Sequence, residues 1–285
     1  MGQTFLQERI NAVVTFRCDL SPGLMTLRVA PVNWVFPDFN PGQYVSLGLF
    51  GSWERTQLAE PEVHAALPER LIRRPYSIAS PPENREFLEF YINLVPNGAL
   101  TPRLFTLVAG DPVHVGSKVA GSFTLRSIPE DANVILIATG TGLAPYASIL
   151  RSSQSFRQRR RIALIHGVRN SPDLGYRSMF TALQCEKAFT YVPVVSRPRI
   201  EIRPWTGAAG HVQDVWKSGV LERAWGFRPN PDNSHVLLCG NPVMIESMIA
   251  ILAAQGFRPQ TARMPGEVHC EKYWTTITYD KPHSS

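Results

Sequence analysis

An uninterrupted apolar run, Val134 to Ala138, leads through a single threonine into Gly140-Thr141-Gly142. A run without polar alternation is typical of a parallel strand that is buried on both faces. Glycines after such a strand allow a tight turn, and the spacing of Tyr146 to Arg151 predicts that a helix follows. Phosphate groups bind well at a helix N-terminus, because backbone amides and the helix dipole face the anion. A short glycine-rich turn on its own is about as often a packing turn as a nucleotide site.

The chain after Pro129 alternates strands with helices. This alternation predicts a doubly wound α/β fold with a parallel sheet over residues 129–285. Besides the first strand, we expect strands at Ile162 to His166, Phe189 to Val195 and Val236 to Cys239, and helices at Tyr176 to Leu183, Val212 to Ser218 and Pro242 to Gln255.

Residues 1–128 follow another pattern, in which short β-rich runs are separated by Pro, Gly and Asn. This is typical of an antiparallel β-barrel or sandwich. The segment from Phe50 to Ile72 interrupts the pattern, and we expect a long loop or a short helical insertion there. The two domains should meet near residues 127–133. Strands are expected at Val13 to Phe16, Met25 to Val29, Gln43 to Leu49, Tyr76 to Ala79, Phe87 to Val95 and Pro112 to Val115.

The composition is that of an ordinary globular protein, with no apolar run near the roughly 18 residues that a membrane span needs. Residues 1–17 lack the apolar core of a secretory signal, so we expect a soluble, cytoplasmic protein. The four cysteines have no CxxC or CxxxxC spacing, which argues against a zinc site or an iron–sulfur cluster within the chain. We interpret Cys18 and Cys185 as small core residues.

Two further motifs carry candidate chemistry in the first half. Arg74-Pro75-Tyr76-Ser77 stands at an expected barrel strand and offers a cation for pyrophosphate, a flat ring and a hydroxyl. Asn97 to Thr101 forms a turn ahead of a helix start at Thr101-Pro102, a second candidate anion cradle. Either motif alone would be read as ordinary surface structure.

The order of these motifs across the whole chain is more specific than any of them singly. Arg-Pro-Tyr-Ser is followed by Val95 to Thr101, then by the turn at 140–145, by Cys239-Gly240-Asn241-Pro242 and by Tyr273-Trp274 near the end. This order resembles the ferredoxin–NADP⁺ reductase family, and the bacterial flavodoxin/ferredoxin reductases in particular. The resemblance covers residues 9–274. It implies a FAD-binding antiparallel β-barrel in residues 1–128 and an NADP-binding α/β domain, with a flavin-covering C-terminal segment, in residues 129–285.

The resemblance also implies roles around FAD. Arg74 would pair with the pyrophosphate, Tyr76 would stack on the isoalloxazine ring, and Ser77 would form a hydrogen bond near its N5 atom. Tyr273 would cover the other face of the flavin, and Trp274 would lie near the adenosine end. The remaining FAD contacts are expected from Pro75, Tyr91, Ile92, Ala99, Leu100, Thr101 and Thr141, with the amides of residues 99–101 facing the phosphates.

A second group of roles concerns NADPH and proton transfer. The resemblance implies that Cys239 lies beside the nicotinamide and that Glu271 helps protons to reach the flavin, with Ser77 relaying them. The catalytic set is therefore Ser77, Cys239, Glu271 and Tyr273, and no metal is expected. NADP-binding residues are expected at Gly140, Thr141, Gly142, Arg169, Ser196, Arg197 and Gly240.

The chain departs from the family where the bacterial relatives carry a second arginine for the 2′-phosphate. Gly210-His211 stands at that place, and Arg199 or Arg203 could substitute. NADPH is therefore expected, and the strength of its preference over NADH is open. The tail from Thr275 to Ser285 is a further departure, which could reshape the nicotinamide slot but which we interpret as an unattached terminus. The insertion from Phe50 to Ile72 is a third, which could contact the FAD adenine or a partner or be a tolerated surface loop.

The function that the resemblance implies is electron transfer between NADPH and a small ferredoxin or flavodoxin, by hydride transfer to flavin N5 and one-electron release. The net charge of +6 suits an acidic partner, and we expect a monomer. The alternative is an NAD(P)H-dependent flavin reductase or the reductase component of an oxygenase system. A nucleic-acid-binding barrel is disfavoured, because the basic run Arg157 to Arg161 is not accompanied by aromatic residues interleaved with basic ones on exposed strands.

Overall fold

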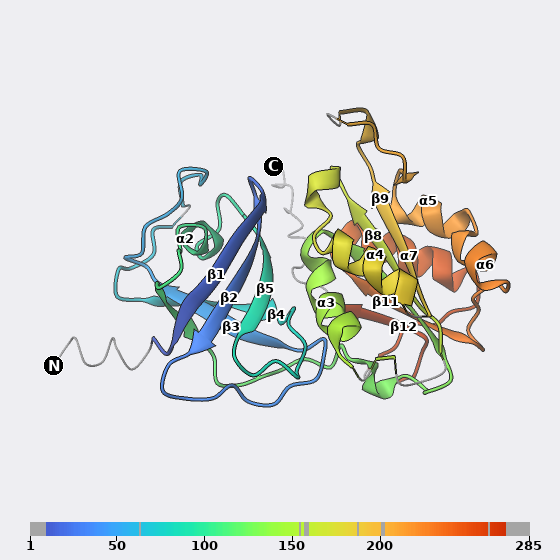
Figure 1. The fold of residues 1–285 in the computed structure, drawn as a ribbon, viewed down its shortest axis with the longest axis horizontal. Helices are drawn as coiled ribbons and strands as arrows, with labels where there is room; N and C mark the ends of the chain where they lie inside the picture. Colours follow the sequence, from blue (N-terminus) through green and yellow to red (C-terminus); the bar gives the residue numbers. More distant parts are fainter. Residues whose placement is uncertain are drawn as a thin grey trace, which may run out of the picture.

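Two six-stranded sheets lie side by side in the computed structural model, which describes residues 10–62, 64–153, 155–156, 160–186, 188–200, 203–261 and 263–271 (Figure 1). The first sheet is antiparallel and uses strands from residues 12–115, and the second is parallel and uses strands from residues 133–271. We call these sheets, with their attached loops and helices, the barrel half and the α/β half. None of the described helices has both the length and the apolar character that a membrane crossing would require.

The antiparallel sheet has the strand order β4-β3-β6-β1-β2-β5. Its two end strands approach each other through one isolated bridge, between Ile78 and Phe90, so the sheet curls into a barrel-like shape without a closing ladder. Apolar side chains fill the inside, among them the fully buried Leu27, Leu47 and Phe90. The strands are β1 (Ala12–Ser21), β2 (Leu24–Pro31), β3 (Tyr44–Phe50), β4 (Leu71–Ser77), β5 (Leu88–Asn93) and β6 (Pro112–Val115), with the short helix α2 (Thr101–Leu104) between β5 and β6.

The parallel sheet has the strand order β10-β9-β8-β7-β11-β12, and every described pair in it is parallel. The chain moves outward from β7 to β10 and then returns to the other side of β7, which makes a doubly wound sheet with a topological switch point between β7 and β11. Helices α3 and α4 pack on one face, and α5, α6 and α7 pack on the other. The elements are β7 (Asn133–Thr139), α3 (Ala144–Arg151), β8 (Ile162–Val168), α4 (Arg177–Glu186), β9 (Phe189–Val195), β10 (Ala208–Ala209), α5 (Val212–Lys217), α6 (Val220–Trp225), β11 (Ser234–Cys239), α7 (Pro242–Ala253) and β12 (Val268–Glu271).

Strands β10 and β12 were not expected from the sequence, and two further details differ from the sequence-based expectations. Strand β4 begins at Leu71 rather than Tyr76, and it pairs with β3 in unbroken register from Phe50–Leu71 to Tyr44–Ser77. Its Arg-Arg-Pro stretch is exposed and hides the strand pattern, which an end strand tolerates because its proline need not donate to a ladder. The segment between β3 and β4 has the loop form, one of the two that were expected, with no helix among its described residues. Cys18 and Cys185 are exposed, so their interpretation as core residues was wrong.

The loop between β3 and β4 is fastened to the segment from Val95 to Thr106. Its strongest link is the buried Arg103, whose Nη1 donates to Glu62 Oε1 at 2.6 Å and to the Ala99 carbonyl at 2.6 Å, while Nη2 donates to the Gly51 carbonyl at 2.9 Å. The hydrogen bond from Arg103 is the main reason that the pKa of Glu62 lies below its usual value. Further hydrogen bonds join Thr56 N to Pro102 O, Glu60 N to Pro96 O and Trp53 Nε1 to Thr106 Oγ1.

We predict that Glu62→Ala lowers the free energy of unfolding by about 3 kcal/mol, because it leaves the Arg103 guanidinium buried without its counter-charge. Chemical denaturation of the two proteins measures this difference. Asp38→Asn provides the control, because the Asp38–Arg85 ion pair is 89% and 58% exposed and should contribute less than about 1 kcal/mol. Equal losses in the two variants would contradict the bracing role of Glu62.

Candidate active site

Three side chains from three different strands meet where the two halves touch. The hydroxyl of Ser77, at the end of β4, donates to Glu271 Oε2 at 3.4 Å. The thiol of Cys239, at the end of β11, lies 3.9 Å from the same oxygen. Ser77 is 6% exposed and Cys239 is fully buried. The predicted catalytic residues Ser77, Cys239 and Glu271 are thus brought together, although Ser77 and Glu271 are separated by 194 positions in the sequence.

Glu271 is the protonatable group of this cluster. Burial raises its pKa to about 7, and the hydrogen bonds from Ser77 and Cys239 oppose this only in part. A carboxyl group with such a pKa is divided between its acid and its carboxylate form near neutral pH. It can therefore both release and take up a proton there, which suits an acid–base role.

The glycine-rich turn after β7 lies against the end of β11. Residues Gly140–Leu143 form a short 3-10 helix that continues directly into α3. A Cβ on Gly142 would lie 2.3 Å from the carbonyl oxygen of Cys239, so no larger residue fits without displacing the backbone. Gly240 has φ +129°, and a Cβ there would lie 2.4 Å from the Thr139 carbonyl oxygen. These two glycines allow β7 and β11 to end side by side at the switch point.

A cavity of about 930 Å³ opens over this turn, at the carboxyl ends of the parallel strands. This is the edge at which doubly wound sheets bind ligands. Five of the predicted NADP residues line it, and Asp173 is its one described carboxylate, against two arginines. The predicted residues in the lining are Gly140, Thr141, Arg169, Ser196 and Arg197. Gly142 and Gly240 are not in the lining but form the backbone beneath it.

Sequence reasoning missed part of this cavity. Ser21, Gly23 and Asn93 contribute from the barrel half, and Asn241 and Met244 contribute from the start of α7. The Asn241 side chain also accepts a hydrogen bond from Val243 N and so caps α7. Asn241 could have been found, because it belongs to the Cys239-Gly240-Asn241-Pro242 motif at the predicted strand end, whereas the barrel residues depend on how the two halves dock. His211, noted as a departure from the family, lies in the lining as well.

The predicted FAD residues of the barrel half fall into two places. Arg74 and Pro75 are exposed on β4, next to the partly buried Tyr76, whose ring packs edge-on against Phe90 at 6.4 Å. At the second place, Thr101 Oγ1 accepts a hydrogen bond from Val95 N at 2.9 Å and thereby closes the turn that contains Ala99 and Leu100. The hydrogen bonds from the loop between β3 and β4, described above, hold the segment that contains this turn.

Tyr91 and Ile92 have buried side chains that serve other contacts. Ile92 belongs to the barrel core, and the Tyr91 hydroxyl donates to the Asp173 carbonyl of the α/β half at 3.0 Å. Contacts of these two residues with FAD would therefore involve the backbone. Tyr273, Trp274, the tail after them and residues 157–159 of the basic run lie outside the described residues.

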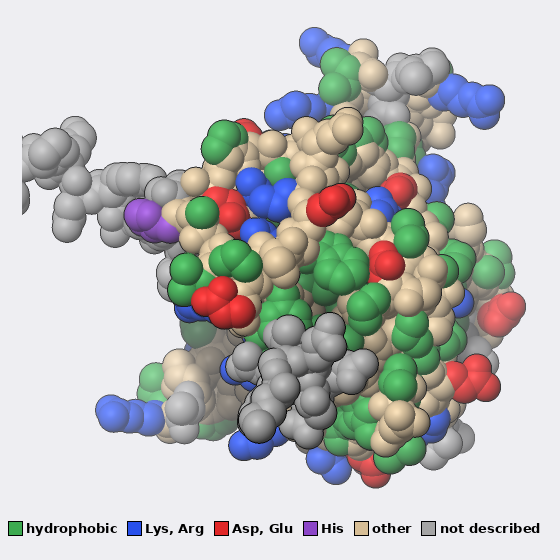
Figure 2. Space-filling view, turned by 90° about the vertical axis from the view of Figure 1, so that its left-hand side faces the viewer, with side chains coloured by type: hydrophobic (Ala, Val, Ile, Leu, Met, Phe, Trp, Pro, Cys, Tyr) green, Lys and Arg blue, Asp and Glu red, His purple; other side chains and the backbone are tan. Residues whose placement is uncertain are grey.

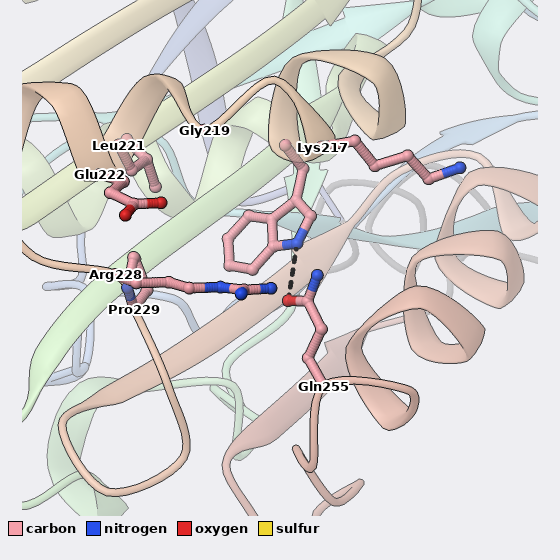
Figure 3. A pocket seen from close by; sticks show the side chains of 8 residues that line it. Lys217, Gly219, Leu221, Glu222, Arg228, Pro229 and Gln255 are labelled. Carbon is pink, nitrogen blue, oxygen red and sulfur yellow. Dashed lines mark hydrogen bonds between the residues drawn. The ribbon is translucent and has the colours of Figure 1, made fainter.

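A second, smaller cavity of about 230 Å³ lies on the α5–α7 side of the α/β half (Figure 3). Trp216 and Gln255 both line it, and the indole Nε1 donates to the Gln255 side chain at 3.1 Å. None of its lining residues is shared with the large cavity. Its lining is that of a surface cleft between helices, and it includes none of the predicted site residues.

Comparison with known proteins agrees with this geometry. Residues 136–249 match a family described as the oxidoreductase NAD-binding domain, which is the class that the doubly wound sheet and its cavity define. The chain is 34% identical to the flavodoxin/ferredoxin–NADP reductase of Escherichia coli (strain K12) over 83% of its own length and 88% of that protein. It is 31% identical to the ferredoxin–NADP reductase of Pseudomonas aeruginosa over 77% and 80% of the two chains. The chain therefore belongs to the flavodoxin/ferredoxin–NADP reductase family.

Solved structures support the fold independently. A ferredoxin–NADP⁺ reductase from Neisseria gonorrhoeae superimposes with a TM-score of 0.78 at 22% identity, over 93% of this chain and 99% of that one. An Amycolatopsis cytochrome P450 reductase superimposes with a TM-score of 0.69 at 26% identity. The match covers 93% of this chain but only 69% of the P450 reductase chain. The predicted combination of an antiparallel, barrel-like sheet and a doubly wound parallel sheet is confirmed.

We predict that Glu271→Gln removes a pH-dependent component of stability. A carboxyl with a raised pKa in the folded state stabilises the fold fully below its unfolded value of 4.5, and this contribution is lost as the pH rises through about 7. Relative to wild type, the variant should therefore gain about 1–3 kcal/mol between pH 5 and pH 8. Urea unfolding at several pH values, at matched flavin content, measures this.

Glu83→Gln is the control. Burial acts to raise the pKa of Glu83, but hydrogen bonds from Ser153 and Ser152 outweigh this and lower it. Its titration therefore lies below pH 5, and its difference from wild type should stay constant from pH 5 to pH 8. A difference between wild type and Glu271→Gln that is equally flat would contradict the raised pKa of Glu271.

Proposed function

We propose that this protein is a FAD-dependent oxidoreductase that transfers electrons between NADPH and a ferredoxin or flavodoxin. The observation that carries the proposal is the cluster of Ser77, Glu271 and Cys239, which joins the end of a barrel strand to the carboxyl edge of the parallel sheet beside the large cavity. A flavin held by the barrel and a nicotinamide held by the α/β half would meet at this place. The curated relatives carry this activity in their names.

The residues present fit both cofactors. A Cβ on Gly140 would have no atom within 4 Å, so the turn that leads into α3 is open toward the cavity and can admit a phosphate. Arg169 and Arg197 supply positive charge farther along the same cavity. On the barrel side, Arg74 is exposed beside the Tyr76 ring, which suits a pyrophosphate next to a stacked flavin. The Neisseria structure with the same fold was determined with FAD and NADP bound.

We assign the protein's own residues the following work. Arg74 and the turn at residues 99–101 hold the FAD phosphates, and Gly140 to Gly142 with Arg169, Ser196, Arg197 and Gly240 hold NADPH. A bound flavin accepts a hydride and releases its electrons singly, which lets it couple a hydride carrier to a one-electron partner. Glu271 stores a proton and Ser77 relays it, over the 3.4 Å contact between them. Cys239, fully buried at the strand end, excludes water beside the nicotinamide.

The same proposal includes a domain boundary between residues 128 and 129, a cytoplasmic location, a monomeric state and an acidic partner. The net charge of +6 favours an acidic partner through electrostatic steering. On the barrel end of the molecule, however, acidic and basic side chains are interspersed with apolar ones (Figure 2). A partner that approaches this face would thus meet apolar as well as charged surface.

A flavin reductase or an oxygenase reductase component is the second candidate. It is favoured by the similarity to the cytochrome P450 reductase and to the ferredoxin reductase of a carbazole dioxygenase, although this chain spans only 69% of each of those proteins. The four cysteines lack the spacing of an iron–sulfur cluster, so residues 1–285 do not themselves supply such a one-electron acceptor. This favours a separate ferredoxin or flavodoxin.

The function is tested with the purified protein under anaerobic conditions. We expect a yellow protein with about one FAD per chain, whose flavin is bleached by NADPH in stopped flow, and which turns over faster with a ferredoxin or flavodoxin than with free FMN. A protein that holds no FAD while Arg74 is intact would refute the proposal. Faster turnover with free FMN than with either protein partner would establish the flavin reductase instead.

We predict that Arg197→Ala raises KM for NADPH about 10- to 100-fold and leaves KM for NADH nearly unchanged, because a charged hydrogen bond to the 2′-phosphate contributes roughly 1.5–3 kcal/mol. Arg223→Ala is the control, since Arg223 is exposed on α6 and does not line the cavity. Steady-state kinetics with both nucleotides measures the selectivity. Equal losses for NADPH and NADH in Arg197→Ala would contradict this role.

A further inference from the structure

Glu89 on β5 is the centre of a polar contact between the two halves. Its side chain is 2% exposed. It accepts hydrogen bonds from Arg28 Nε at 2.7 Å within the barrel half, and from Arg151 Nη1 at 2.5 Å and the Tyr176 hydroxyl at 2.9 Å in the α/β half. The Arg151 guanidinium also lies over the Tyr176 ring, 5.8 Å from its centroid. We call this boundary between the barrel half and the α/β half the seam. One buried carboxylate thus binds groups from both sides of it.

Neighbouring contacts extend this seam along α3. The Ser148 hydroxyl donates to the Ser80 carbonyl at 2.7 Å, and Arg151 Nη1 donates to the Ala79 carbonyl at 3.1 Å. At the end of the helix, Glu83 accepts hydrogen bonds from the Ser152 hydroxyl and from the backbone and side chain of Ser153. Apolar side chains also pack across the seam in one core cluster. It contains Leu24, Ala79 and Tyr91 from the barrel half and Leu143, Ala144 and Tyr146 from the α/β half.

The seam is connected to both parts of the candidate active site by short pieces of chain. Ala79 follows Ser77 by two residues, at the end of the strand that carries Arg74 and Tyr76. Arg151 is the last residue of α3, and α3 begins directly after Gly140–Leu143. Helix α3 faces the barrel half (Figure 1). Because Arg151 contacts both Glu89 and the Ala79 carbonyl, helix α3 connects the end of β4 to the glycine-rich turn.

Glu89 remains ionised in this setting. Burial acts to raise its pKa, but the charges and hydrogen bonds of Arg151, Arg28 and Tyr176 outweigh burial and lower it. A buried carboxylate with three donors holds them in one arrangement, because a partner that moves away leaves the charge uncompensated. The contact consequently resists sliding of one half over the other.

We propose that Glu89, through Arg151 and Tyr176, is a positioning residue that sets the distance between the barrel strand carrying Ser77 and the nucleotide-binding turn. This rests on the function proposed above, in which hydride transfer occurs between cofactors held by the two halves. Hydride transfer requires the donor and acceptor atoms within van der Waals reach, and a displacement of about 1 Å can cost up to about 100-fold in rate. Glu89 touches neither of the predicted cofactor-binding turns.

The test compares two arginines that bind the same carboxylate from opposite sides. Arg151→Gln breaks the contact across the seam, whereas Arg28→Gln breaks the contact within the barrel half. We expect Arg151→Gln to slow flavin reduction by saturating NADPH about tenfold or more, with dissociation constants for FAD and NADP⁺ within about threefold of wild type. Arg28→Gln should leave the reduction rate within about twofold. Tyr176→Phe removes a single hydrogen bond across the seam and should give an intermediate rate, which covers the case in which Arg151→Gln folds poorly.

A second readout needs no cofactor. Amide hydrogen exchange of the apoproteins should be faster in α3 and in residues 78–91 of Arg151→Gln, and near wild type there in Arg28→Gln. Equal slowing of reduction in the two arginine variants, or unchanged reduction and exchange in Arg151→Gln, would overturn the proposal. If wild-type protein bound no FAD or were not reduced by NADPH, the proposed function would fail, whereas the exchange experiment would still report on the seam.

Discussion

The spacing between two separately built sheets is the constraint on which the rest of this structure depends. The barrel half and the α/β half each have their own core, yet Ser77 contacts Glu271 only because β4 ends opposite β12. Polar contacts from Glu89, Ser80 and Glu83 to α3 and Tyr176 hold the two sheets at this spacing. An apolar seam alone would permit small shifts, because hydrophobic contact has no preferred direction.

Local crowding complements this long-range constraint. The backbones of β7 and β11 end so close together that positions 142 and 240 have no room for a side chain. The turn after β7 is thereby held beside Cys239, and α3 leaves it in a direction that brings Arg151 to Glu89. The glycine-rich turn, the end of β11 and the contacts between the two halves are consequently parts of one connected framework.

Strands β7, β8, β9 and β11 of the parallel sheet and the glycine-rich turn could be predicted from the sequence, because strands buried on both faces are continuously apolar and their turns need glycine. Strands β10 and β12 were not predicted, since they are short end strands without such an apolar run. The start of β4 could not, since an exposed end strand with Arg73, Arg74 and Pro75 has no alternating pattern. Within the site, Ser77, Cys239 and Glu271 were identified through a family resemblance. No local pattern predicts a contact across 194 positions, a carboxyl whose pKa depends on burial, or the entry of Ser21 and Asn93 into the cavity.

The unbroken pairing of β3 with β4 has a consequence for how such proteins diversify. Because the ladder runs from Tyr44–Ser77 to Phe50–Leu71, residues 51–70 connect the two strands at the end of the hairpin that lies away from Ser77. Residues can be added or removed at that end without rotating the Tyr76 ring or the Ser77 hydroxyl to the opposite face of the sheet. A change in this loop that keeps the contacts of Thr56, Glu60 and Glu62 with residues 96–103 can thus add surface while Tyr76 and Ser77 keep their alignment.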